Sequence, residues 1–141
     1  MPPSVLVDTA EVLAQPGDRA VLGPSADGGY YLLGLKTMHV RLFDDIAWST
    51  EIVARQTLER AAEIGLAVHV LPEWYDVDDC QTIRILMEEV LEGRDFSADL
   101  QRAPAQHSLA LLKSLVAHSD LAGRLDRFLS RVAATADEAV A

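Results

Sequence analysis

The first stretch of the chain that could bind a ligand is Pro24-Ser25-Ala26-Asp27-Gly28-Gly29-Tyr30. Two adjacent glycines let a ligand approach the backbone closely, while Asp27 can contact a hydroxyl group or a metal ion. The same residues can also form an ordinary tight connection between two strands. The stretch has neither the glycine and lysine spacing of a P-loop nor the G-x-G-x-x-G spacing of a Rossmann turn.

A second stretch, Tyr75-Asp76-Val77-Asp78-Asp79, places three acids between an expected strand and an expected helix. Carboxylates at the carboxyl ends of strands in an open α/β sheet face the crevice in which ligands bind, so we expect Asp27 and Asp78 to approach one shared cleft. Oxygen ligands suit Mg²⁺ or Mn²⁺, which also bridge substrate phosphates. Alternatively, Asp76 and Asp78 are solvated loop acids. Under both interpretations Asp79 is placed to cap the next helix.

A third stretch, Trp48-Ser49-Thr50, comes where a helix is expected to begin. An indole ring and two hydroxyl groups at a helix N-terminus could hold an acceptor substrate or an anion. The alternative is a capping pair, with Ser49 or Thr50 as the N-cap and Trp48 packed against the fold. The residue types alone favour this second interpretation.

Other kinds of site find little support in the sequence. The four histidines have no metal-binding spacing, the single cysteine has no partner for a disulfide, and there is no G-x-S-x-G motif, so no catalytic residue is identified. A net charge of −10 argues against binding a nucleic-acid backbone. The lone cysteine, the lack of a signal-peptide pattern and the lack of a long apolar run predict a cytoplasmic protein with no membrane contact.

The elements that must position these residues alternate between helix and strand. Helix-like apolar spacing or short apolar runs, with glycines and prolines between them, predict helices at 3–14, 49–64 and 79–93 and strands at 20–23, 30–35 and 66–71. This alternation predicts an α/β layer architecture with mixed or parallel strand pairing.

The composition changes after Gly93, which divides the chain into expected domains at 1–93 and 94–141. Two further helical patterns follow, one with Leu109 and Leu112 and the other with Leu121 and Leu125. Because only residues 118–120 separate them, we expect a C-terminal helical hairpin with antiparallel helices.

Three segments together resemble the bacterial DUF2064 family of glycosyltransferase-like proteins: GPSADGGYYLLGL, LFDDIAWST and LPEWYDVDDCQTI. The chain is also similar to the cofactor nucleotidyltransferases of the same superfamily. The resemblance covers residues 2–89 and implies a partial GT-A (nucleotide-diphospho-sugar transferase, Rossmann-like) fold with an α/β/α layer.

The resemblance implies metal-dependent transfer from a nucleotide-activated donor to an acceptor. It assigns the metal ion, Mg²⁺ or Mn²⁺, to Asp78 and secondarily to Asp76. It places Asp27, Gly28 and Gly29 in the wall of the substrate pocket, and it places the Trp48-Ser49-Thr50 segment facing the acceptor.

The chain lacks two upstream features of the family, a basic glycine-containing nucleotide loop and an Asp-rich metal motif. We therefore expect the C-terminal half of a transferase, with no appreciable transfer activity on its own. The alternative is a non-catalytic module that forms a homo-oligomer or pairs with another chain, because missing strands would leave an open sheet edge.

Overall fold

A computed structural model of the protein describes residues 1–100, 102 and 105–140. The chain forms two compact units, one of residues 1–76 with 97–103 and the other of residues 77–96 with 104–141. The division falls inside the acidic stretch after Asp76. It therefore differs from the boundary at 93/94 that the change in composition suggested.

The first unit is built on a three-stranded sheet with the strand order β2-β1-β3. Strand β1 (Arg19–Pro24) pairs antiparallel with β2 (Tyr30–Leu35) and parallel with β3 (Ala67–Val70). These elements confirm the predicted α/β class and its mixed pairing. The parallel pair is formed across a connection that contains helix α2, as a parallel crossover requires.

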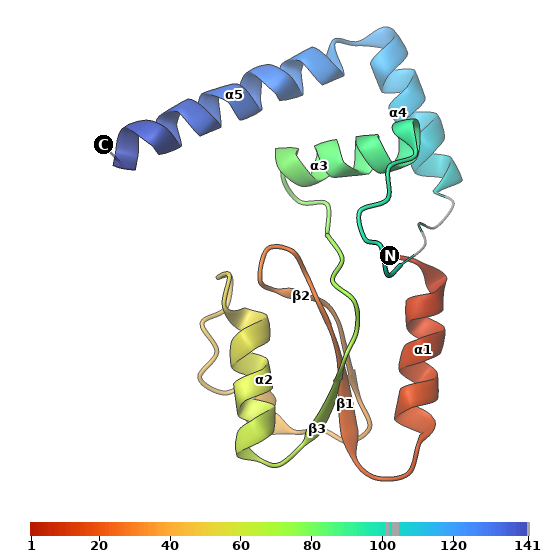
Figure 1. Ribbon diagram of the computed structural model, residues 1–141, viewed down its shortest axis with the longest axis vertical. Helices are drawn as coiled ribbons and strands as arrows, with labels where there is room; N and C mark the ends of the chain where they lie inside the picture. The colour runs from red at the N-terminus through yellow and green to blue at the C-terminus, as the bar shows by residue number, and fades with distance from the viewer. Residues whose placement is uncertain (101, 103–104, 141) are drawn as a thin grey trace. The chain divides into compact units, whose positions relative to one another are not determined.

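The core of this unit centres on β1, which lies between the two other strands. Figure 1 shows the sheet between α1 (Pro3–Ala14) and α2 (Val53–Glu63). Ala20, Val21 and Leu22 are at most 1% exposed, as expected for a strand that is covered on both faces. Removing such side chains from water is the largest favourable term in folding. Burial of β1 therefore fixes the position at which the following loop begins.

The start of α2 corrects the sequence prediction that Ser49 or Thr50 would cap this helix. The helix begins at Val53 after Ile52, and no described side chain caps it. Instead, Thr50 Oγ1 donates to the carbonyl of Ala47 at 2.6 Å, within a turn that precedes the helix. The predicted end at Gly65 is confirmed, since this glycine has φ +67° directly after the C-cap Ile64.

The second unit is helical and contains α3 (Cys80–Met87), a π-helical turn η2 (Glu88–Glu92), α4 (Gln106–His118) and α5 (Leu121–Val140). The expected cap of α3 is confirmed: Asp79 Oδ1 accepts from the Thr82 backbone N–H at 2.7 Å. This bond is the main cause that lowers the pKa of Asp79. None of the described helices is long and apolar enough to cross a membrane.

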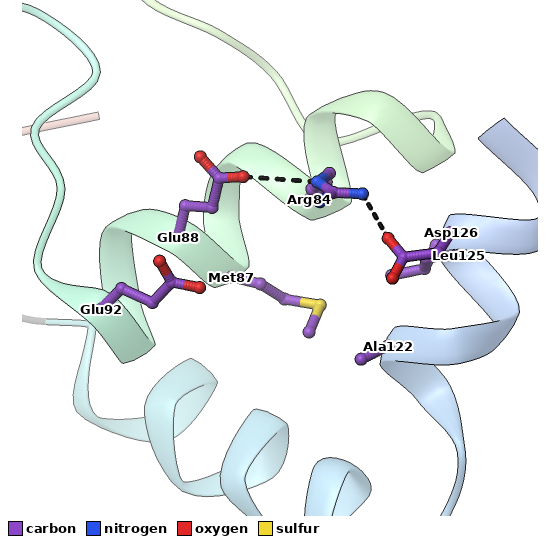
Figure 2. Close-up of a pocket in the computed structure, with 7 residues that line it drawn as sticks. All are labelled: Arg84, Met87, Glu88, Glu92, Ala122, Leu125 and Asp126. Atoms are coloured by element: carbon purple, nitrogen blue, oxygen red, sulfur yellow. Dashed lines mark hydrogen bonds and ion pairs between the residues drawn. The ribbon is translucent and has the colours of Figure 1, made fainter. Parts of the chain in front are cut away.

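Figure 2 shows where α5 meets α3 in this unit, around a hollow of about 210 Å³. Arg84 forms ion pairs with Glu88 and Asp126. These side chains are roughly one third to three fifths exposed, and exposed pairs of this kind contribute about 0–1 kcal/mol. Leu125 is only 7% exposed and lines this hollow together with Met87, so burial of apolar surface also stabilises the junction.

Both predicted C-terminal helices are confirmed, but their expected antiparallel packing is wrong. Figure 1 shows α4 and α5 diverging from the corner at residues 119–120 instead of running side by side. Leu125 and Asp126 of α5 face α3 at the hollow of Figure 2. The two C-terminal helices α4 and α5 therefore meet at a bend and do not form a hairpin.

Candidate functional site

The loop after β1 lies beside the segment after β3, and backbone hydrogen bonds join the two. The Leu71 amide donates to the carbonyl of Leu22 at 2.8 Å, and the Trp74 amide donates to that of Pro24 at 3.1 Å. The Ala26 amide returns a bond to the carbonyl of Trp74 at 2.9 Å. The two bonds to Trp74 come from the neighbours of Ser25 and constitute the parallel bridge between Ser25 and Trp74. The pairing of β1 with β3 thus continues past the ends of both strands.

Within the loop, three short bonds fix the backbone around Asp27. The Ser25 amide donates to the Gly29 carbonyl at 3.0 Å, and the Gly28 amide donates to the Ser25 carbonyl at 3.0 Å. The Gly29 amide donates to Asp27 Oδ1 at 2.9 Å, an Asx-type turn that restrains the carboxylate itself. The loop does connect two strands, as the alternative interpretation held, and it also holds Asp27 in a defined position.

Gly28 is required by its surroundings as well as by its backbone conformation. Its φ is +87°, and an added Cβ would lie 2.0 Å from the carbonyl oxygen of Glu51. The Ala54 amide donates to the Gly28 carbonyl at 2.9 Å, at the start of α2. The loop is therefore pressed directly against the segment that follows Trp48, Ser49 and Thr50.

The Trp48-Ser49-Thr50 segment is exposed and conformationally strained. Trp48 is 51% exposed, so the interpretation as a packed indole is wrong. Ser49 has φ +64°, which is uncommon for a residue with a side chain. A bond from the Ala47 amide to Gln56 Oε1 at 2.8 Å helps to hold the turn. Strain of this kind persists only where the surrounding structure enforces it, and it gathers at functional sites.

Asp27 and Asp76 approach each other in the first unit, with carboxylate oxygens within 4.8 Å. Both side chains are exposed. Ser25 Oγ donates to Asp76 Oδ1 at 2.8 Å. Two oxygen ligands at this separation fit a hard cation such as Mg²⁺ or Mn²⁺. Asp78 lies two residues further along the chain, in the second unit, so its predicted approach to Asp27 stays a prediction.

Aromatic side chains anchor the backbone next to these carboxylates. Trp74 and Tyr75 are 4% and 6% exposed, and their rings stack with centroids 5.4 Å apart. The Tyr31 hydroxyl donates to the carbonyl of Pro72 at 2.8 Å. Burial raises the pKa of the Tyr31 hydroxyl. The residues that precede Asp76 are thus held on both sides.

Sequence reasoning missed the contribution of Ser25 and of Tyr31 to this site. Each makes its contact with a residue that is distant in sequence, Ser25 across 51 positions and Tyr31 across 41. A serine in a loop and a tyrosine in a strand carry no local signal of such contacts. The apolar run into Trp74 showed a strand, but not which loop it would meet.

Known proteins resemble this chain in sequence and in structure. The sequence model of DUF2064, described as an uncharacterized protein conserved in bacteria, matches residues 1–50. The resemblance to DUF2064 is confirmed. The matched region includes both the Asp27-Gly28-Gly29 loop and the Trp48-Ser49-Thr50 segment.

A crystal structure of a protein from Desulfovibrio desulfuricans G20, proposed to be a nucleotide-diphospho-sugar transferase, is similar over 83% of this chain. The TM-score is 0.63 and the sequence identity is 28%. The match covers 47% of that chain, so this protein spans about half the length of the solved structure that it resembles. No curated protein matches the chain. The fold is therefore that of a nucleotide-diphospho-sugar transferase-like protein.

The two contacts of Gly28 lead to a stability prediction. We expect Gly28→Ala to lower the free energy of unfolding by clearly more than Gly65→Ala. Both residues have positive φ, where a side chain costs about 1–2 kcal/mol. At Gly65 an added Cβ meets no described atom within 4 Å, whereas at Gly28 it collides with the Glu51 backbone.

Urea unfolding of the two variants, followed by circular dichroism, measures the difference. Gly65→Ala serves as the control for backbone strain alone. Equal losses in the two variants would show that the loop does not press against the Glu51 segment.

Proposed function

We propose that this protein takes part in metal-dependent transfer from a nucleotide-activated donor, as a nucleotide-diphospho-sugar transferase-like protein. The observation that supports this most directly is the approach of Asp27 to Asp76 at the end of the β1–β3 pairing. Ligands of open α/β sheets bind at the carboxyl ends of parallel strands, which is where these carboxylates lie. A bound Mg²⁺ or Mn²⁺ would neutralise the charge of a donor diphosphate.

We propose Asp78 as a further ligand, on the basis of chain geometry. An extended chain advances at most about 3.3–3.6 Å per residue, so the Cα atom of Asp78 lies within roughly 7 Å of the Cα atom of Asp76. Asp79 is already engaged as the cap of α3, through its bond to Thr82. Asp76 and Asp78 are therefore the acids of this stretch that are proposed to bind the ion.

The substrate side of the proposed site comes from the two other stretches. We propose that Gly28 and Gly29 let the donor approach the backbone next to Asp27, since neither presents a side chain there. The exposed indole of Trp48, with the hydroxyls of Ser49 and Thr50, offers an apolar face and polar groups to an acceptor. The contact of Gly28 with Glu51 supports the proximity of these two segments.

The proposal predicts saturable binding of Mn²⁺ that depends on Asp76. We expect Asp76→Asn to weaken Mn²⁺ binding at least tenfold, because the amide keeps the shape of the side chain but not its charge. Calorimetric titration of the chain with Mn²⁺ measures this, and addition of a nucleoside diphosphate should tighten binding of the wild type.

Asp8→Asn is the matched control, since Asp8 is an exposed acid on α1 and its loss changes the net charge by the same amount. Equal weakening in the two variants would mean that Mn²⁺ responds only to net charge. Turnover assays with a panel of nucleotide sugars then test whether this chain alone catalyses transfer.

A second candidate function is a non-catalytic module that pairs with another copy of the chain. The observation that favours it is the exposure of large apolar side chains on the C-terminal helices. Leu111 on α4 is 60% exposed and Phe128 on α5 is 51% exposed. Apolar surface of this kind often marks a protein–protein contact.

If this second function holds, light scattering at micromolar concentration should give a mass above that of the monomer. The Leu111→Glu and Phe128→Glu variants should then return the mass to that of a monomer, because a buried charge opposes association. A monomer mass for the wild type would remove this candidate.

A further inference from the structure

We infer that Ser25 is a positioning residue of the proposed metal site, acting on Asp76 through its hydroxyl group and on Asp27 through its backbone. This inference rests on the proposed function, because it assigns a role to a residue within the same site. Ser25 is 4% exposed, although it lies in a loop, whereas Asp27 and Asp76 are both exposed.

The hydroxyl of Ser25 restrains a side chain that would otherwise rotate in solvent. Its Oγ donates to Asp76 Oδ1 at 2.8 Å, a normal length for a bond between a hydroxyl and a carboxylate. A carboxylate has about four lone-pair sites, so this bond leaves most of its capacity for a cation. Asp76 therefore does not have to lose all of its rotational freedom when an ion binds.

The backbone of Ser25 acts on the other carboxylate. Its amide donates to the Gly29 carbonyl and its carbonyl accepts from the Gly28 amide, which closes the turn that carries Asp27. The bonds of its neighbours Pro24 and Ala26 to Trp74 tie this turn to the chain that leads into Asp76. Ser25 thus bonds on both sides of the site, to Asp76 through its hydroxyl and around Asp27 through its backbone. Substitution of its side chain can test the hydroxyl separately, because the backbone bonds remain.

Removal of the hydroxyl should weaken cation binding without unfolding the protein. We expect Ser25→Ala to lower the affinity for Mn²⁺ by about threefold to tenfold, the range expected when one side chain must be ordered on binding. The unfolding transition should shift little, because Asp76 is exposed and can bond to water instead. Ser25→Thr, which keeps the hydroxyl, should restore the affinity.

A double-mutant cycle separates positioning from a general structural effect. Calorimetric Mn²⁺ titrations are compared for the wild type, Ser25→Ala, Asp76→Asn and the double variant. If Ser25 acts through Asp76, Ser25→Ala should cause no further loss in the Asp76→Asn background. The matched control is Thr57→Val, which removes another buried hydroxyl of the first unit, bonded to Val53 at 3.0 Å.

The outcomes distinguish this inference from the proposed function. If the wild type binds Mn²⁺ and Ser25→Ala binds it equally well, the role of Ser25 is overturned while the metal site stands. An equal loss in Thr57→Val, or an undiminished loss in the Asp76→Asn background, also overturns it. Absence of saturable Mn²⁺ binding by the wild type overturns the proposed function, and the inference with it.

Discussion

The candidate site depends on the backbone hydrogen bonds that join Trp74, which follows β3, to Pro24 at the end of β1 and to Ala26 beyond it. They arise because β1 and β3 are parallel neighbours, so the chain leaves both strands at the same edge of the sheet. The buried core around Val21 and Leu22 fixes the starting point of this pairing. Everything proposed for Asp27 and Asp76 follows from it, since neither carboxylate is held by burial of its own.

The same pairing works against electrostatic repulsion. Asp27 and Asp76 place two negative charges within 4.8 Å of each other, and like charges at this distance repel, in a chain whose net charge is −10. The backbone bonds and the bond from Ser25 to Asp76 oppose the separation of these charges. A divalent cation would neutralise this repulsion, and this agrees with the proposed role of the two carboxylates as metal ligands.

The sequence predicted what depends on local chemistry. Gly65 and Gly93 end their elements in positive-φ conformations, and Asp79 caps α3, as their residue types indicated. The prediction was wrong where distant contacts contribute, as at the start of α2, where the Ala54 amide donates to the Gly28 carbonyl and no side chain caps the helix. The hydrogen bond from Ser25 to Asp76 spans 51 positions, and neither a loop serine nor a loop aspartate predicts such a partner. The resemblance to DUF2064 supplied the motifs, and strand geometry predicted that their loops share a cleft, but the hydrogen bonds that hold these loops required the structure.

The central claim, that the Asp27 loop and the Asp76 segment form one cation-binding position, is tested most directly by paramagnetic broadening of amide NMR signals. At substoichiometric Mn²⁺, the account predicts selective loss of the Gly28, Gly29 and Asp76 amide signals. The signal of Gly65, at the opposite end of β3, should persist. Because the chain contains 22 acids, non-specific binding would broaden signals across many acidic surfaces at once. Broadening spread in that way, or centred away from Gly28 and Asp76, would contradict the account.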